Sequence, residues 1–323
     1  SMFYHWGIIQ KVVGAFAWVL RKFMNISGSE GLVAAGNIFM GMTESPVLIK
    51  NYLPTMNRSE IFLVMVSGMG TIAGSVMGTY IGMLGGTDPA AKVLFATHLL
   101  SASVMAVPGS IVLAKMLCPQ TEEATDHVAI SGKEKENSNI LDAISSGTVT
   151  GVKLMTNIAA MLLVFISLVS LANYITEGVI GRYTGLNDWI VKITDGKAQG
   201  LTFQFILGVI TSPFMWLIGV PSQDIMLVGS LLGQKTILNE FVAYFQLQQW
   251  KDAGLFMYEK SILMSTYILC GFANISSIGI LLGGLGVLAP EKRGLISRIG
   301  VPAMIGGALV SVLSATIIGM ILG

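Results

Sequence analysis

The chain has 323 residues, of which 53% are hydrophobic and only 11% are charged, and its mean hydropathy is +0.72. About a quarter of the residues in a soluble domain are charged, so this composition indicates a membrane protein. The 19 Lys and Arg residues balance 18 Asp and Glu residues, which leaves no basic surplus for binding nucleic acid. Two cysteines and three scattered histidines give neither a disulfide framework nor metal-ligand spacing.

The first segment, residues 1–27, combines aromatic residues with cations. Lys11 and Arg21 split and flank its apolar run, and no small-residue cleavage site follows, which argues against a signal peptide. Because Phe16 and Trp18 accompany these cations, we expect an interfacial amphipathic helix lying along the membrane. A membrane-spanning helix is the less favoured alternative.

The next segment, residues 28–118, is predicted to begin with a re-entrant hairpin. Residues 28–57 are apolar, but the sequence Gly41-Met42-Thr43-Glu44-Ser45-Pro46 interrupts them. A spanning helix needs about 20 apolar residues, and each side of the interruption is shorter. Irregular backbone persists at membrane depth only where it is buried in protein or faces a wet cavity, so we expect the hairpin tip to face a cavity.

Two further helices complete this first repeat. Residues 61–87 contain glycine and hydroxyl residues at 67–71, which predicts a broken transmembrane helix. Residues 93–114 form a charge-free window that predicts an unbroken span.

A polar stretch from Glu122 to Asp142 separates two halves of the chain and predicts a linker over residues 119–146. Residues 147–194 should then provide a scaffold transmembrane helix and an interfacial segment. Residues 291–323 should provide a C-terminal transmembrane helix.

Residues 195–290 resemble the first repeat. Gly31-Leu32, Ser45-Pro46 and Pro54 recur as Gly200-Leu201, Ser212-Pro213 and Pro221, and eight residues separate the two prolines in both copies. In this register the segment from Gln223 matches that from Ser59, the segment from Ile262 matches that from Val93, and a second break falls at 233–236. Interrupted segments at corresponding positions in two halves are typical of the midplane site of a secondary transporter. If the repeats are inverted, the two hairpins enter from opposite faces.

Two acids lie within these interrupted segments, Glu44 in the first hairpin and Glu240 in the second broken segment. An ionisable group at the centre of a spanning helix costs about 2.5–3.5 kcal/mol or more, so both are candidates for function. Two structural alternatives remain open: Glu44 caps the second hairpin helix, or Glu240 pairs with Lys235.

Polar residues and one aromatic residue accompany the two acids. They are Asn37, Thr43, Thr71, Ser75, Asn239, Asn274, Ser276 and Ser277, with Phe272 among them. Carboxylates, amides and hydroxyls beside an aromatic ring suit a neutral, polyhydroxylated solute that carries a flat ring. Bonding between neighbouring helices is the alternative role for many of these polar residues.

Four separated motifs resemble those of the concentrative nucleoside transporters. They are GNIFMGMTESPVLIKNYL from Gly36, GTIAGSV from Gly70, LNEFVAY from Leu238 and GFANISSIG from Gly271. The resemblance covers nearly the whole chain. It implies a transporter and not an enzyme: a homotrimer whose transport domain moves like an elevator against a trimer scaffold, importing nucleosides with sodium or, in some members, with protons.

The resemblance also implies roles for individual residues. The nucleobase would lie near Met42, Thr43, Glu44 and Val76, and the ribose near Glu240, Asn274 and Ser277 with Phe272 packing nearby. A sodium ion would bind the carbonyl groups of Asn37, Met40, Ile72 and Ser75 and the hydroxyl of Thr71. Oxygen-only coordination suits a hard cation, and no organic cofactor is implied.

This chain departs from the family pattern in two ways. Many members have Gly-Gln-Thr-Glu where this chain has Gly41-Met42-Thr43-Glu44, which removes an amide that both donates and accepts. The thioether accepts an apolar ring face, so a shift toward purine nucleosides is a hypothesis. Family members also carry further transmembrane helices before the interfacial helix, so we expect this sequence to be part of a longer chain.

The sequence thus predicts an all-α, multi-pass protein of the cell membrane with inverted repeats, two re-entrant hairpins and broken helices. A proton-coupled symporter using Glu44 or Glu240 is the main alternative. An intramembrane enzyme using both acids is less favoured because of the repeat. An ion channel is also less favoured because the sequence contains no filter-like repeat or charge ladder.

Overall fold

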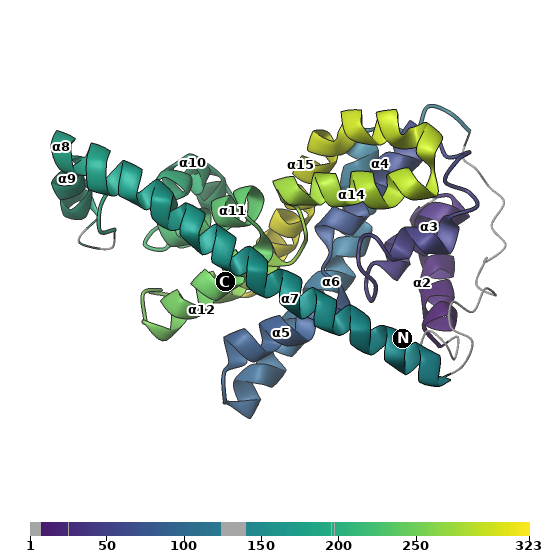
Figure 1. Ribbon diagram of the computed structural model, residues 1–323, viewed down its shortest axis with the longest axis horizontal. Helices are drawn as coiled ribbons and strands as arrows, with labels where there is room; N and C mark the ends of the chain where they lie inside the picture. Colours follow the sequence, from purple (N-terminus) through teal and green to yellow (C-terminus); the bar gives the residue numbers. More distant parts are fainter. Residues whose placement is uncertain (1–7, 25, 124–139, 195, 197) are drawn as a thin grey trace.

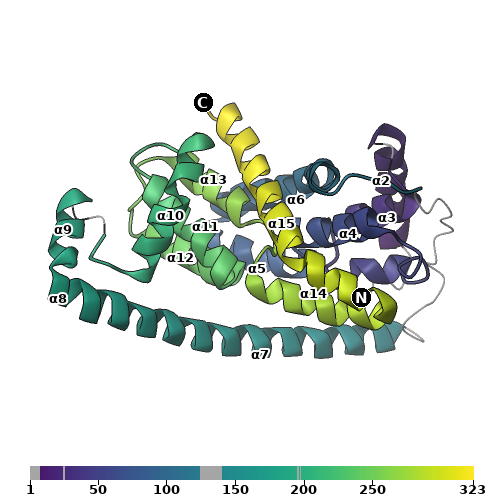
Figure 2. The ribbon, with the colours of Figure 1, turned by 90° about the horizontal axis from the view of Figure 1, so that it is seen from above.

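The computed structural model describes residues 8–24, 26–123, 140–194, 196 and 198–323, and all regular elements in these ranges are helical. The helices form two successive groups along the chain, and α15 (Arg293–Ile321), which ends the second group, runs through the middle of the molecule (Figures 1 and 2). The helix α7 (Ile140–Asn173) extends along the length of the molecule beside both groups (Figure 2).

The first group contains six elements. They are α2 (Ile8–Met24), α3 (Gly28–Gly36), the 3-10 helix η1 (Ser45–Ile49), α4 (Arg58–Gly70), α5 (Gly74–Gly85) and α6 (Pro89–Leu117). Capping boxes formed by Ser27 with Glu30 and by Asn57 with Glu60 begin α3 and α4. The predicted hairpin is therefore α3, a tip and η1, and the predicted broken helix is α4 and α5.

The second group follows a connection made of the π-helix η2 (Tyr174–Gly181), α8 (Arg182–Thr184) and α9 (Leu186–Ile193). Its helices are α10 (Phe203–Leu217), α11 (Ile225–Ile237), α12 (Glu240–Asp252), α13 (Glu259–Leu269) and α14 (Ile275–Leu288), and the 3-10 helix η3 (Pro290–Lys292) leads into α15. The hairpin here is α11 and α12, with its tip at Leu238-Asn239, and the broken helix is α13 and α14.

The order and length of the helices define the repeat. The pair α4 and α5 has 13 and 12 residues, the pair α13 and α14 has 11 and 14, and α6 and α15 have 29 each. The counterpart of α6 is therefore α15, so the predicted register, which matched Val93 with Ile262, is wrong. The two Ser-Pro pairs that this register matched are not structurally equivalent, because Pro46 lies in the first turn of η1 whereas Pro213 lies inside α10.

The N-terminal helix α2 has the amphipathic character expected of an interfacial helix. Val13 is buried against the first group, whereas Trp18 is 63% exposed and Lys22 Nζ lies 5.2 Å from the centre of its ring. The predicted Phe16 is also exposed, and its ring meets Phe39 of the hairpin edge-on at 6.5 Å. The first residues of the predicted segment 1–27 lie outside the described residues.

Three helical stretches of the described residues are long and apolar enough to cross a membrane: Arg58–Gly85, Pro89–Leu117 and Pro290–Ile321. The charge-free window 198–223 contains α10, whose 15 residues extend only about 23 Å, less than the hydrocarbon core. Part of the predicted linker 119–146 lies outside the described residues, and α7 already begins at Ile140, before the predicted end of that linker.

Candidate functional site

The breaks of the two broken helices meet at the centre of the molecule. Gly271, at the second break, has φ +146°, and a β-carbon there would lie 2.9 Å from the Met69 carbonyl oxygen and 3.0 Å from the carbonyl carbon of Gly70. Gly307 of α15 also lies close to this crossing, since a β-carbon added at Gly307 would lie 2.7 Å from the β-carbon of Met69. Only glycine allows the two chains to approach so closely.

The second hairpin tip carries Glu240 as the first residue of α12. Asn239 caps this helix by accepting a hydrogen bond from the amide of Val242 at 2.9 Å. The Glu240 side chain is 8% exposed and accepts hydrogen bonds at both oxygens, from the Tyr80 hydroxyl at 3.1 Å and the Asn274 amide at 3.0 Å. A buried carboxylate is thus held in one orientation by donors from α5 and from the second break.

Asn274 is the centre of a second set of hydrogen bonds. Its Oδ1 accepts from the Ser276 hydroxyl at 2.6 Å, from the Ser277 hydroxyl at 3.0 Å and from the Ser277 amide at 2.9 Å, which caps α14. Phe272 is half-buried beside this network. The structure therefore brings together the predicted residues Glu240, Asn274, Ser276 and Ser277.

The first hairpin tip is joined to α4 through Asn37. Its Nδ2 donates to the Ser67 hydroxyl at 2.6 Å, and its Oδ1 accepts from the Ser45 hydroxyl at 2.6 Å. The Thr71 hydroxyl donates to the Ser67 carbonyl at 3.0 Å, and the Gly74 amide donates to the Phe39 carbonyl at 3.2 Å. The tip and the first break therefore lie side by side, as the interrupted segments predict.

The residues after Asn37 place the predicted base-binding group in this same tip. Met42 is buried against Gly68, where a β-carbon would lie 2.8 Å from that of Met42. Thr43 is exposed and lies against α14, because a β-carbon on Gly284 would be 3.2 Å from the Thr43 methyl group. Val76, in the first turn of α5, is buried.

Glu44 is exposed at the tip, and its Oε2 accepts the Gly41 amide at 3.2 Å. Glu44 is also the residue before η1, but its side chain makes no capping hydrogen bond to that helix. The alternative in which Glu44 caps the second hairpin helix is therefore wrong.

Lys235 is not the partner of Glu240. The Lys235 ammonium donates to the Ile268 carbonyl at 2.8 Å and to the Ser311 hydroxyl at 3.0 Å. The alternative in which Glu240 pairs with Lys235 is therefore not what the structure contains.

Two helices connect the two halves of the site. The helix α5 runs from Gly74, at the first tip, to Tyr80, at Glu240, which is about 9 Å along its axis. The helix α14 runs from Asn274, at Glu240, to Gly284, at Thr43, which is about 15 Å. The two acids thus lie in different parts of the site, at different hairpin tips.

The residues predicted to bind a cation lie in the first tip and the first break. Met40, Thr71 and Ile72 are buried, whereas Ser75 is exposed in the first turn of α5. Within the described part of the chain, no backbone amide donates to the carbonyl groups of Asn37, Met40 or Ile72. Carbonyl oxygens without such donors, beside a hydroxyl, fit the ligand preference of a hard cation.

Tyr80 was not among the residues predicted from the sequence. It is buried, and its ring stacks on that of Tyr244 with ring centres 4.2 Å apart. A buried tyrosine hydroxyl usually finds a hydrogen-bond partner, so a tyrosine within an otherwise apolar run is the sequence feature that indicated a polar contact here.

Other buried acids have structural partners. Glu30 accepts the Lys115 ammonium at 2.5 Å, which ties α3 to the end of α6. Asp224 accepts the amides of Met257 and Tyr258 at 3.0 and 3.2 Å, which ties the start of α11 to the start of α13. Burial of an acid in this fold therefore does not by itself mark the substrate site.

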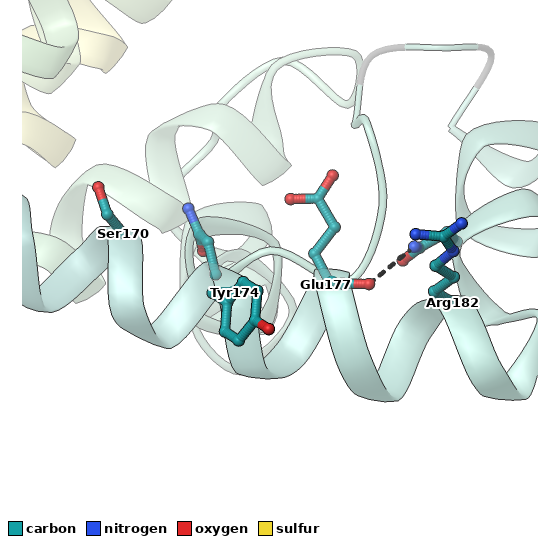
Figure 3. A pocket seen from close by; sticks show the side chains of 7 residues that line it. Ser170, Tyr174, Glu177 and Arg182 are labelled. Carbon is teal, nitrogen blue, oxygen red and sulfur yellow. Dashed lines mark hydrogen bonds between the residues drawn. The ribbon is translucent and has the colours of Figure 1, made fainter.

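A pocket of about 390 Å³ lies elsewhere, around the π-helix η2 (Figure 3). It is lined by Ser170, Asn173, Tyr174, Glu177, Gly178, Arg182 and Asn187. The Asn187 amide donates to the Glu177 carbonyl at 3.0 Å across it (Figure 3). None of the residues predicted for substrate or cation lines this pocket.

Two hairpins whose tips meet broken helices in an all-helical membrane fold define the class of secondary transporters. Residues 98–319 match the family described as "Na+ dependent nucleoside transporter C-terminus", and residues 1–87 match the one described as "Nucleoside recognition". The chain belongs to the concentrative nucleoside transporter family, and it is a multi-pass integral membrane protein.

Relatives and solved structures agree with this assignment. An uncharacterized transporter of Haemophilus influenzae is 38% identical over 326 residues, which cover 100% of this chain and 73% of that protein. Sodium/nucleoside cotransporter 1 of Rattus norvegicus is 38% identical over 99% of this chain and 48% of its own length, so the chain spans about half of that relative. CNTnw in an inward-facing substrate-bound state superposes with a TM-score of 0.86 at 35% identity, covering 100% of this chain and 72% of that one.

Proposed function

We propose that this protein imports nucleosides together with a cation, and that the cation is sodium. The family description and the name of the rat relative, a sodium/nucleoside cotransporter, support this proposal. The single observation that carries it is the network in which Tyr80 and Asn274 hold the buried carboxylate of Glu240 at the second hairpin tip.

The hydrogen-bonding groups of this network suit the ribose of a nucleoside. Glu240 accepts from sugar hydroxyls, Asn274 fixes the orientation of its carboxylate, and Ser277, which holds Asn274, offers a further polar contact. Phe272 provides an apolar surface beside them.

The first hairpin tip is proposed to receive the base. Thr43 and Glu44 are exposed there and offer a hydroxyl and a carboxylate to the base edge, while Met42 and Val76 provide apolar contact. A nucleoside has a sugar at one end and a base at the other, which agrees with a site whose two polar parts are carried by different hairpins.

The proposed cation site consists of oxygen atoms from the first tip and the first break. Its ligands are the carbonyl groups of Asn37, Met40, Ile72 and Ser75 and the hydroxyl of Thr71. The Thr71 hydroxyl donates its proton to the Ser67 carbonyl, which directs its lone pairs away from that bond. A sodium ion moving inward across 100 mV supplies about 2.3 kcal/mol for uptake.

We propose an elevator-type movement for transport. The solved structures of CNTnw and its variants include inward-facing, outward-facing and intermediate states, which supports alternating access in this family. In this proposal the two repeats, α3 to α6 and α11 to α15, carry the site, and residues 147–194 belong to the scaffold. The helix α7 exposes many apolar side chains, such as Leu163 at 73%, which suits contact with lipid or with other copies in a homotrimer.

Uptake of a radiolabelled nucleoside into proteoliposomes tests this function. The full-length protein is measured in sodium and in choline buffers, each across a range of pH. We expect saturable uptake that requires sodium at every pH. Uptake driven by a pH gradient in choline would instead support the proton-coupled alternative, in which Glu44 or Glu240 carries the proton. Absence of nucleoside uptake in every buffer would refute the proposal.

A further inference from the structure

The two hairpins are joined to their broken helices by different chemistry. In each repeat, the end of the first hairpin helix bonds to the end of the first half of the broken helix. We call these contacts the first junction, where Asn37 meets Ser67, and the second junction, where Lys235 meets Ile268. The repeat order makes them equivalent, because α3 corresponds to α11 and α4 corresponds to α13.

The second junction contains a buried lysine side chain. Lys235 is 0% exposed, and its ammonium donates to the Ile268 carbonyl at 2.8 Å and to the Ser311 hydroxyl at 3.0 Å. Ser311 in turn donates to the Cys270 carbonyl at 2.8 Å. These carbonyls lie at the C-terminal end of α13, where free carbonyl groups concentrate negative potential and favour a cation.

The first junction is closed by neutral groups. Asn37 bonds to Ser67 and Ser45, and Thr71 bonds to the Ser67 carbonyl. This is also the C-terminal end of a half-helix, since α4 ends at Gly70, so the same negative potential is expected there. Among the described residues, the contacts that close the first junction include no ammonium group, and an exchangeable cation suits that position.

We propose that Lys235 is a fixed internal cation that takes, at the second junction, the place that the coupling cation takes at the first. It holds the second hairpin against α13 and α15 whether or not sodium is bound, so sodium controls only the first hairpin and one cation is coupled to each nucleoside. The inference rests on the proposed sodium-coupled function. Lys235 acts through Glu240, five residues further along the same hairpin, and is therefore a positioning residue.

The substitution Lys235→Asn tests this role, because it places at the second junction the amide found at the first. Nucleoside affinity of the purified full-length protein is titrated with sodium, with choline keeping the ionic strength constant. The slope of log affinity against log sodium concentration should be about one in the wild type and about two in the variant. At high sodium the variant should regain affinity.

A second measurement does not involve nucleoside. Sodium that binds only the folded state raises the melting temperature, and a second site adds to the rise. We therefore expect sodium to raise the melting temperature of nucleoside-free Lys235→Asn more steeply than that of the wild type. Lys235→Gln serves as a second variant if the first one is poorly folded.

Two further variants complete the experiment. Ser311→Ala keeps the ammonium group and should leave the sodium slope unchanged, even if the protein is less stable. Asn37→Lys places a fixed cation at the first junction and should make nucleoside binding independent of sodium.

The outcomes separate the inference from the proposed function. The inference would be overturned if the sodium slope of nucleoside affinity and the sodium-induced rise in melting temperature stayed at wild-type values in the Lys235 variants. It would also be overturned if nucleoside binding by Asn37→Lys still depended on sodium. A wild-type protein whose nucleoside affinity does not depend on sodium would contradict the proposed coupling instead.

Discussion

Tyr80→Phe tests whether the orientation of Glu240 matters for binding. The substitution keeps the ring that stacks on Tyr244 and removes only the hydroxyl that donates to Glu240 at 3.1 Å. This hydrogen bond is already present before substrate binds, so its loss does not subtract a substrate contact. Without it the Asn274 amide still holds the carboxylate, which must then be ordered further when the nucleoside binds; ordering one side chain costs about 0.5–1.5 kcal/mol.

The expected result is a rise in the nucleoside Kd of about two- to twelvefold. Tyr244→Phe is the matched control, because that hydroxyl donates to the Thr266 carbonyl at 2.8 Å and not to Glu240. Both variants should lose stability, by about 1.5–3 kcal/mol for the bond to the carboxylate and about 1 kcal/mol for the other. A lower melting temperature is thus expected of both variants and does not report on the orientation of the carboxylate, whereas a loss of affinity is expected of Tyr80→Phe alone.

Equilibrium binding of a labelled nucleoside to the two purified variants, at saturating sodium, decides the question. Equal affinities for wild type and Tyr80→Phe would refute the role of Tyr80. Equal losses in the two variants would show that general loosening of the tyrosine pair, and not the orientation of the carboxylate, affects binding.

Three further substitutions test other parts of the structure. Gly271→Ala should destabilise the protein by about 2–5 kcal/mol, because the φ angle is unfavourable for alanine and the methyl group would clash with the Met69 carbonyl. Gly82→Ala, where the β-carbon meets open space, should not destabilise it. Thermal unfolding measures both variants, and equal melting temperatures would contradict the packing argument. Thr71→Ala should raise the sodium concentration needed for half-maximal uptake, and an unchanged sodium titration would remove Thr71 from the cation site. Met42→Gln should weaken competition of uridine uptake by adenosine and guanosine relative to cytidine, and a wild type that already excludes purines would contradict the purine hypothesis.

The sequence predicted the kinds of elements in this fold better than their positions. Glycine and hydroxyl residues indicated a break at 67–71, but α4 continues to Gly70 and the break is at 71–73. Glycine permits a break without requiring one, and Gly68 serves instead to let Met42 pack against the helix. The second predicted break, at 233–236, lies inside α11, where the buried contacts of Lys235 support a continuous helix.

Some residues of the candidate site could be predicted from the sequence and others could not. Glu240, Asn274 and Ser277 meet because the second hairpin tip lies against the break between α13 and α14. Polar residues within apolar segments are few, so these three could be selected from the sequence alone. Tyr80 carries a hydroxyl in an apolar helix, which indicates that a partner exists, but only tertiary packing reveals that the partner is Glu240. The partners of Lys235 are backbone and a hydroxyl from distant elements, which spacing along the chain does not encode.

The close crossing of Gly271 with the backbone of Met69 and Gly70 affects how the protein tolerates sequence drift. The contact leaves no room for even a methyl group, and closely packed interiors transmit displacement rather than absorb it. A shift of the backbone at one break therefore displaces the other. The two repeats therefore cannot change in sequence independently where they touch. Replacing one repeat with that of a distant homologue would require both segments of this contact to be exchanged together.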